Sequence, residues 1–352
     1  MSTLIQPGDG QRLPSVSGEA ASAETTALER ALKAAVRGEV RFDPGSRGMY
    51  STDASSYRQV PIGVVIPRGE DDVRETVRLA REHGAPILGR GGGTSLAGQC
   101  CNVAIVLDFS KYMGAVLEVN PEERWARVQP GCVLDDLRDA VAPHGLTFGP
   151  DPATHDRCTL GGMLGNNACG AHSVQADHFG PGPRTEDQVL ELRVLTYDGE
   201  ELTVGATSPE ELERIIAGGG RRGQIYRDLK ALGERYQGPI RDRFPDIPRR
   251  VSGYNLPALL PDGDFDVAKA LVGTESTAVL FLEAKVRLIP DPPERVLLLL
   301  GYTDIYHAAD HVVEIQKHRP LALEGIDENL PEFMKLKDLY VDSLDYLPEG
   351  HG

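Results

Sequence analysis

The sequence is poor in cysteine. It has five, and none of them forms a Cys-x-x-Cys pair. An odd number without paired spacing argues against a disulfide framework, a zinc ribbon and an iron–sulfur cluster in this stretch. We expect buried or inert thiols at all five positions, and a reducing cytoplasm as the setting.

Long apolar runs are also missing. The longest aliphatic run is Val-Leu-Leu-Leu-Leu at residues 296–300, far below the ~20 residues that a membrane-spanning helix needs. The N-terminus lacks a basic start followed by an apolar core, so it does not read as a secretory signal. The sequence predicts no transmembrane segment, and it leaves open a peripheral association with a membrane.

Basic residues are outnumbered. The chain carries 37 Lys and Arg against 53 Asp and Glu, a formal net charge of −16. Because phosphate backbones need a basic surface, nucleic acid is not an expected partner. Hydrophobic residues make up 40% of the 352 residues, which is enough for a sizeable core and for two domains, or one domain with an appendage.

Hydrophobic spacing predicts alternating strands and helices after a polar N-terminal segment. Residues 1–24 are expected to be a mobile tail. Residues 149–182 are dense in Gly, Pro, Asn and His and are expected to be irregular and functional. Strands are predicted at 62–66, 86–88, 104–107, 125–129, 189–196, 278–289 and 295–301, and helices at 25–37, 71–83, 134–141, 225–236 and 307–317.

A glycine-rich loop, RGGGTS at residues 90–95, follows the strand predicted at 86–88. Successive backbone N–H groups without side-chain obstruction can form an anion site. A P-loop would need lysine and a hydroxyl residue where Gln99 and Cys100 stand. A dinucleotide fingerprint would need glycine at Leu96. Both of these motifs fail, which leaves another kind of phosphate loop or an ordinary glycine turn.

Four motifs occur in the order found in one flavoprotein family. They are RGGGTSLAGQ at 90–99, GPDPATHDRCTLGGMLGNNACGAHS at 149–173, RRVSGYNLPALLP at 249–261 and ALVGTESTAVLFLEAKVRLIP at 270–290. Together they resemble the FAD-binding PCMH-type flavoproteins of the vanillyl-alcohol oxidase and p-cresol methylhydroxylase superfamily. Within it, they are most similar to the D-lactate, glycolate and D-2-hydroxyglutarate dehydrogenase branch, as found in the N-terminal part of large fused FAD and iron–sulfur oxidoreductases.

The resemblance implies an α+β fold. Two α/β subdomains, at about residues 25–110 and 111–290, would hold FAD between them. The proline-rich break at 290–293 would end this FAD-binding domain. Residues 291–352 would be the start of an incomplete cap domain.

The resemblance also implies a set of FAD contacts. The family often tethers its flavin through a histidine in the first loop, where this chain has Thr94 and Ser95, so non-covalent FAD is expected. The family usually has glycine where Ser276 stands, which makes that turn a departure from the pattern. The implied contacts are Arg90, Gly91, Gly92, Gly93, Thr94, Ser95, Gln99, Pro150, Asp151, Gly161, Gly162, Asn166, Asn167, Ala168, Gly170 and Glu275.

Candidate substrate contacts lie in the third motif, and no catalytic residue is assigned. Arg249 and Arg250 could form a fork for a carboxylate or a surface basic pair. Tyr254 could face the flavin or the core. Histidines 155, 172 and 178 crowd the second motif without dedicated metal spacing. Histidines 307 and 311 share a helix face at a spacing that suits a metal pair, but they lie outside the flavin motifs and are expected on a solvated face, so no metal is predicted.

The function implied is an FAD-dependent oxidation of a D-2-hydroxy acid, with hydride transfer to flavin N5. The electron acceptor would be a protein, a quinone or an iron–sulfur region. One alternative is a fragment that holds FAD without turnover, because the substrate cap is missing. A second is the chemistry of the NADPH-dependent cell-wall enolpyruvyl reductases, which these motifs fit poorly.

Overall fold

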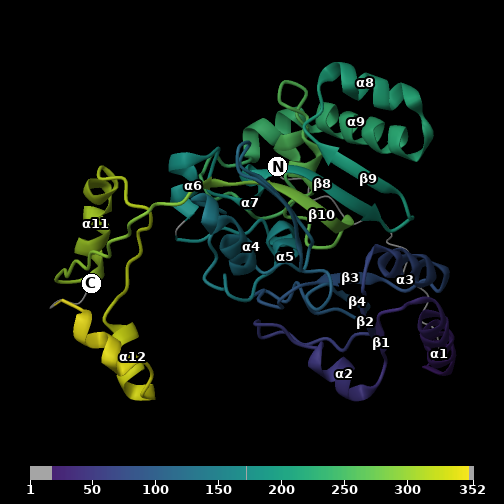
Figure 1. Cartoon of the computed structure of the whole chain (residues 1–352), viewed down its shortest axis with the longest axis horizontal. Coiled ribbons are helices and arrows are strands. Elements are labelled where there is room, and N and C mark those ends of the chain that lie inside the picture. The colour runs from purple at the N-terminus through teal and green to yellow at the C-terminus, as the bar shows by residue number, and fades with distance from the viewer. Residues whose placement is uncertain (1–17, 172, 349–352) are drawn as a thin grey trace, which may run out of the picture.

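The computed structural model describes residues 18–171 and 173–348 (Figure 1). Most of the tail expected at 1–24 lies outside the described residues, as does His172. Residues 18–24 belong to the first helix, so the helical segment begins earlier than the spacing of Leu28, Leu32 and Val36 indicates.

The N-terminal part is a four-stranded sheet of order β1-β2-β4-β3, covered by two helices. Strands β2, β3 and β4 are parallel, and β1 pairs antiparallel with β2. Helices α1 and α3 pack on one face of this sheet. Every position of β2 and β4 is buried, and all of them except Asp108 at the end of β4 are apolar or glycine, because both faces of the sheet are covered. The elements are α1 Gly18–Ala35, β1 Glu39–Arg41, α2 Pro44–Met49, β2 Gly63–Ile66, α3 Glu70–Glu82, β3 Ile87–Arg90 and β4 Ile105–Asp108.

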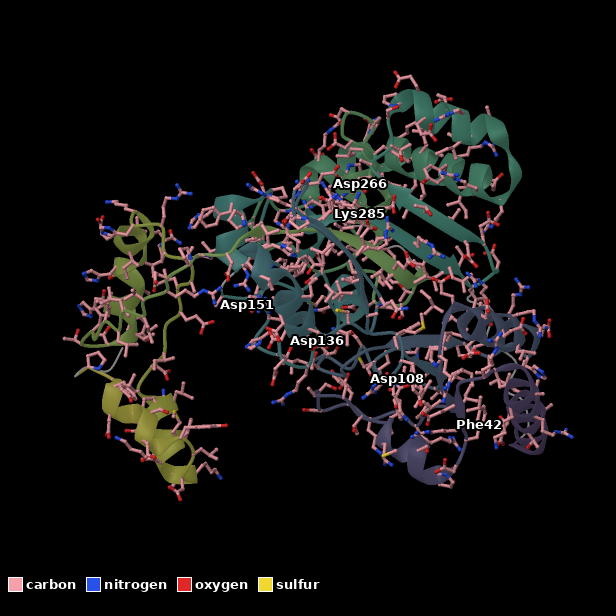
Figure 2. All side chains as sticks on the ribbon, viewed as in Figure 1. Phe42, Asp108, Asp136, Asp151, Asp266 and Lys285 are labelled. Carbon is pink, nitrogen blue, oxygen red and sulfur yellow. The ribbon has the colours of Figure 1, made fainter. Side chains whose placement is uncertain are left out.

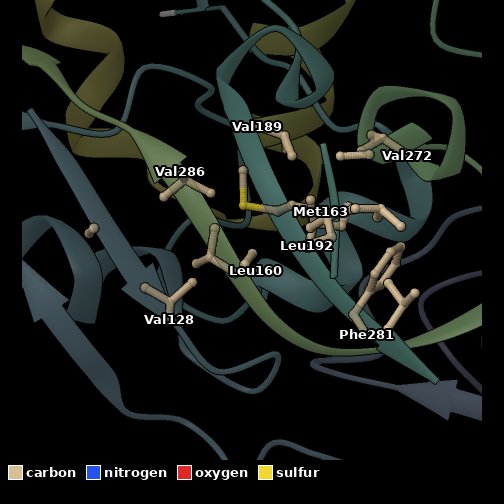
Figure 3. Close-up of a cluster of buried hydrophobic side chains, with 14 of the residues drawn as sticks. Val128, Leu160, Met163, Val189, Leu192, Val272, Phe281 and Val286 are labelled. Atoms are coloured by element: carbon tan, nitrogen blue, oxygen red, sulfur yellow. The ribbon is translucent and has the colours of Figure 1, made fainter. Parts of the chain in front are cut away.

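The central part is a five-stranded antiparallel sheet of order β5-β6-β10-β8-β9. Leu160 and Met163 of helix α5 pack against this sheet in the larger core (Figure 3). The elements are β5 Val116–Asn120, β6 Trp125–Val128, α4 Leu134–Val141, η1 Ala142–His144, β7 Leu146–Thr147, α5 Leu160–Asn166, α6 Ser173–Phe179, α7 Thr185–Gln188, β8 Val189–Thr196, β9 Glu201–Gly205, α8 Pro209–Gly218, α9 Gly220–Arg243, η2 Leu256–Leu259, α10 Val267–Leu271, β10 Val279–Arg287 and β11 Ile289–Pro290.

The two sheets share one apolar interface and a set of ion pairs. Leu195, Leu280 and Leu282 of the second sheet belong to the core of the first. Glu70 of α3 pairs with Arg193 of β8 at 2.8 Å. Residue 110, the expected boundary between the subdomains, lies in the chain between the last strand of the first sheet and the first strand of the second. We propose it as the subdomain boundary.

The C-terminal part, residues 291–348, packs little against the rest (Figure 1). None of its described residues is buried. One contact joins the C-terminal part to α6: the Nε2 atom of His178 lies 3.1 Å from the carbonyl oxygen of Pro320. The elements of the C-terminal part are α11 Ile305–Gln316, α12 Asn329–Lys337 and η3 Val341–Tyr346.

The strand predicted at 295–301 is wrong. The segment has no regular structure, and Val296 is 94% exposed. An apolar run makes a strand only where another strand takes up its backbone hydrogen bonds, and the described residues offer none here. The irregular segment predicted at 149–182 is also partly wrong, because it contains α5 and α6. Among the described helices, none is long and apolar enough to cross a bilayer.

Candidate functional site

A cleft forms where the two sheets meet, and three of the four motifs line it. It encloses about 600 Å³ of space, counting the solvent at its mouth. The first glycine loop, helix α5 and the turn before β10 form its walls, although they are far apart in sequence. The lining residues are Gly89, Arg90, Gly91, Ser95, Gln99, Cys100, Phe109, Pro130, Thr159, Gly161, Gly162, Gly165, Asn166, Glu275, Ser276, Val279, Leu280 and Phe281.

The first glycine loop packs directly on the chain that precedes α5. A Cβ on Gly92 would lie 2.3 Å from the carbonyl oxygen of Arg157, closer than any real contact. The backbone carbonyl of Gly93 accepts from Ala54 N at 3.0 Å. Gly92 is therefore required for the approach of one chain segment to another, whatever ligand the loop also meets.

Arg90 lines the cleft, but its guanidinium is used by the protein. Nη1 donates to the Cys100 carbonyl at 2.9 Å, and Nη2 donates to the Thr52 carbonyl at 2.9 Å. The group also lies 5.3 Å from the centre of the Tyr50 ring. Arg90 thus closes the loop onto its neighbours, and its charge is held at the edge of the cleft.

Helix α5 presents three small residues to the cleft: Gly161, Gly162 and Gly165. Thr159 caps the helix, with Oγ1 accepting from Gly162 N at 3.3 Å. A Cβ on Gly165 would have a single neighbour, the Glu275 Cα at 3.9 Å. This glycine leaves space inside the cleft that no part of the protein fills.

Several residues that are expected to contact FAD are not part of the lining of this cleft. Asn167 is buried, and its Oδ1 accepts from Glu186 N at 3.0 Å. The Ala168 carbonyl accepts from Thr185. These two residues, with Pro150, Asp151, Gly170, Gly92, Gly93 and Thr94, are not among the residues that line the cleft.

The segment around Asp151 contacts helix α4 and the later part of the second motif. Asp151 Oδ1 accepts from Arg138 Nη1 of α4 at 2.7 Å. A Cβ on Gly170 would lie 1.5 Å from the Asp151 carbonyl oxygen. Gly170 is needed because the two halves of the second motif cross at that point.

The turn before β10 ties the cleft walls together. Glu275 and Ser276 have φ values of 49° and 63°, in the left-handed region. Glu275 N donates to the Gly165 carbonyl at 3.0 Å, and Gln99 Nε2 donates to Glu275 Oε1 at 3.2 Å. The Ser276 hydroxyl accepts from Gly89 N at 3.1 Å, so serine takes the backbone position of the family's usual glycine and adds a link to β3.

The candidate substrate residues lie beyond the end of α5. Arg250 Nη2 donates to Asn255 Oδ1 at 3.1 Å, and its guanidinium lies 5.5 Å from the centre of the Phe244 ring. Arg249 is exposed, and its Nε donates to Cys169 Sγ at 3.2 Å. The exposed Tyr254 hydroxyl is 2.7 Å from Thr277 Oγ1. The two arginines face different partners and do not form a fork.

The cysteines divide into buried and accessible thiols. Cys101, Cys132 and Cys158 are buried, whereas Cys100 and Cys169 are partly exposed. Burial raises the pKa of Cys158 to about 11 and that of Cys132 to about 12. Cys100 lines the cleft, with Sγ 3.2 Å from Ser95 Oγ. No group of three or more metal-ligating side chains occurs in the described part of the chain.

Sequence reasoning missed part of the lining. Phe109 and Pro130 reach the cleft from outside the four motifs, and residues 279–281 lie in the fourth motif but are not among the expected FAD contacts. Thr159 and Gly165 lie inside the second motif and were passed over. A Thr before a Leu-Gly-Gly helix start is an N-cap signal, and it could have placed α5 and its glycines at the site.

Comparison with known proteins gives one family match and several relatives. Residues 61–205 match the profile of the FAD binding domain family. The chain is 34% identical to a D-2-hydroxyglutarate dehydrogenase of Pseudomonas putida over 91% of its length, which is 32% of that protein. It is 30% identical to the glycolate oxidase subunit GlcD of Bacillus subtilis, over 86% of this chain and 53% of that one. The chain thus spans about a third to a half of these curated relatives.

Solved structures share the fold. An alkyldihydroxyacetonephosphate synthase superposes with a TM-score of 0.59 at 18% identity, covering 92% of this chain and 53% of that one. A 4-ethylphenol oxidase from Gulosibacter chungangensis gives 0.51 at 19%, covering 80% of this chain and 45% of that one. Together, the cleft motifs and the family match show that the chain carries an FAD binding domain, and the solved structures show that it shares their fold.

Proposed function

We propose that FAD binds non-covalently in the cleft. The observation that carries this proposal is the space beside Gly165, which the protein leaves open although this glycine is in a helix. Main-chain groups of Gly91 and Ser95 would hold the diphosphate, and Gln99 and Glu275 would close over it. Thr94 and Ser95 stand where a tethering histidine would be, and this supports a dissociable cofactor.

We further propose that the whole protein oxidises a D-2-hydroxy acid of the D-lactate, glycolate or D-2-hydroxyglutarate type. The relatives' names support this substrate class. Bound FAD would accept the hydride of the substrate C–H bond at N5, while a base takes the hydroxyl proton. The chain's own task is to hold and orient the acid and to exclude water.

Arg249 is the best candidate for the substrate carboxylate. Arg250 is engaged with Asn255 and Phe244, and Tyr254 with Thr277. Arg249 is exposed and lies near the end of α5, where its Nε donates to Cys169. Among the described residues, Nε is the only atom of its guanidinium with a hydrogen bond. A guanidinium with free Nη groups can bind a carboxylate through two hydrogen bonds.

The alternative is a chain that holds FAD without turnover. The observation in its favour is that residues 291–348 have no buried residue and do not line the cleft. We infer that 291–352 belongs to a cap and 25–290 to the FAD-binding domain. The electron acceptor, whether a protein, a quinone or an iron–sulfur region, stays a proposal.

Two measurements test these proposals. Acid precipitation of the FAD-loaded protein should release the yellow colour into the supernatant, and flavin in the pellet would contradict a dissociable cofactor. Anaerobic mixing with D-lactate, D-2-hydroxyglutarate and glycolate should bleach the flavin with one of them. Arg249→Ala should slow that bleaching, and Arg241→Ala, which breaks an exposed pair with Asp262 and a hydrogen bond to Gln237 away from the cleft, should not. No bleaching with any acid would support the alternative.

A further inference from the structure

Glu186 is a charged residue buried outside the cleft. It lies in α7 and is 2% exposed. Burial raises the pKa of Glu186, and the charge of Arg184 opposes that rise. Burying a carboxylate is costly unless its partners are well placed. The arrangement of those partners therefore indicates what the residue does.

The two oxygens of Glu186 face two different donors. Oε2 accepts from the Asn255 side-chain amide. Oε1 lies 2.5 Å from Arg184 Nη1, in an ion pair whose angle is not that of a hydrogen bond. Arg184 is fixed in turn by Asp187, through Nε at 3.0 Å and Nη2 at 2.9 Å.

Both donors also hold Arg250, the neighbour of Arg249. Asn255 Oδ1 accepts from Arg250 Nη2 at 3.1 Å, and Arg184 Nη1 donates to the Arg250 carbonyl at 3.3 Å. Asn255 Nδ2 further donates to the Lys269 carbonyl at 3.2 Å. Glu186 thus holds Asn255 directly and reaches the Arg250 backbone through Arg184, so it is linked to both parts of the segment that follows Arg249.

The same helix holds the end of α5. The Glu186 backbone N–H donates to Asn167, and Thr185 Oγ1 donates to the Ala168 carbonyl at 2.7 Å. Cys169, the next residue, receives the Arg249 hydrogen bond. Thr185 and the Glu186 backbone of α7 therefore hold the chain at the end of α5, and the side chain of Glu186 contacts the segment that carries Arg249.

We propose that Glu186 is a positioning residue, which holds the segment 249–255 against the end of α5 and so sets Arg249 at the edge of the cleft. The substrate part of this inference rests on the proposed role of Arg249. Glu186 itself touches neither cofactor nor substrate. A carboxylate suits the task because it accepts from an amide and pairs with a guanidinium at once, which a neutral side chain of the same size does not do.

The test compares Glu186→Gln with Asp266→Asn in FAD-loaded protein. Asp266 is also a buried carboxylate (Figure 2), but its Oδ1 caps α10 by accepting from Lys269 N. We expect Glu186→Gln to speed hydrogen exchange of residues 249–255 and to weaken binding of oxalate, a carboxylate probe read from the flavin spectrum, each by about tenfold. Asp266→Asn should change neither, and FAD affinity should stay within about twofold in both.

A double-mutant cycle separates positioning from general stability. In an Arg249→Ala background, adding Glu186→Gln should cost no further oxalate affinity, because the effect acts through Arg249. If Glu186→Gln does not yield folded protein, Asn255→Ser removes the same link from the other side. Unchanged exchange in 249–255, or faster exchange with unchanged oxalate binding, would overturn the proposal. If Arg249→Ala alone leaves oxalate binding unchanged, the proposed role of Arg249 fails, and the exchange result still decides whether Glu186 positions the segment.

Discussion

The two glycine-rich walls of the cleft use glycine for different reasons. In the first loop, a Cβ on Gly92 would lie 2.3 Å from the Arg157 carbonyl oxygen. In helix α5, a Cβ on Gly165 would meet only the Glu275 Cα at 3.9 Å. The first glycine is required by the protein's own packing, and the second leaves room for something else. Glycine-rich motifs can therefore contain glycines that the packing of the protein requires and glycines that leave room for a ligand.

The largest effect should come from Gly92→Val. The added side chain would push the first loop away from Arg157, so we expect the FAD-free protein to lose about 2–4 kcal/mol of unfolding free energy and also to lose FAD. Urea denaturation of FAD-free protein measures the first effect. An unchanged denaturation midpoint would remove the distinction between the two walls.

Thiol labelling should show which cysteine shares the cleft with the cofactor. We expect FAD to slow alkylation of Cys100 by about tenfold. Cys169 is also partly exposed but does not line the cleft, so its labelling rate serves as the internal control. Cys132 and Cys158 should stay unlabelled at pH 8, because burial raises the pKa of both thiols. Equal labelling of Cys100 with and without FAD would place the cofactor elsewhere.

The turn that joins the two walls should respond to small changes at Ser276. Ser276→Ala loses the hydrogen bond to Gly89 and keeps the left-handed φ, so we expect a loss of about 1 kcal/mol. Ser276→Gly loses the same bond but relieves the backbone, so its stability should stay within about 0.5 kcal/mol of the parent. Thermal denaturation compares the two variants, and a larger loss for glycine would contradict this reasoning.

The smallest effect concerns pH and the first sheet. Hydrogen bonds from Lys111, Tyr112 and Arg41 lower the pKa of Glu39 to about 2. Because the folded-state pKa is depressed, the stabilisation is present above about pH 4.5 and is lost as the pH falls toward 2. The Glu39 carboxylate and its partners are partly exposed, so we expect Glu39→Gln to lower the free energy of unfolding by about 0.5–1 kcal/mol at pH 7. A cost that stays constant down to pH 2 would contradict the assignment.

Much of the fold could be predicted from hydrophobic spacing. The strand at 189–196 and the helix at 134–141 have the bounds predicted for them. In the helix, the buried Leu134, Leu137 and Val141 recur at helical spacing along one face. The run at 295–301 failed because strand formation depends on a partner that local sequence does not reveal. Helix α5 was hidden by its own glycines, which weaken a helical pattern.

The site was predictable in kind more than in detail. Motif positions such as Gly91, Ser95, Gln99 and Glu275 do line the cleft. Asn167 and Ala168 belong to the same motif yet turn toward α7. Phe109 and Pro130 reach the cleft from elements that carry no motif. Which side of a segment faces the cleft is decided by tertiary packing, and a single sequence does not show that.

The most direct measurement is an FAD titration of Gly165→Val against Gly48→Val. Gly48 is also a helical glycine with nothing within 4 Å of an added Cβ, but it lies in α2, away from the cleft. We expect Gly165→Val to weaken FAD binding by at least about tenfold and to keep an FAD-free stability near that of the parent. Gly48→Val should keep both the FAD affinity and the stability of the parent. Full FAD affinity in Gly165→Val would contradict the claim that this cleft is where the cofactor binds.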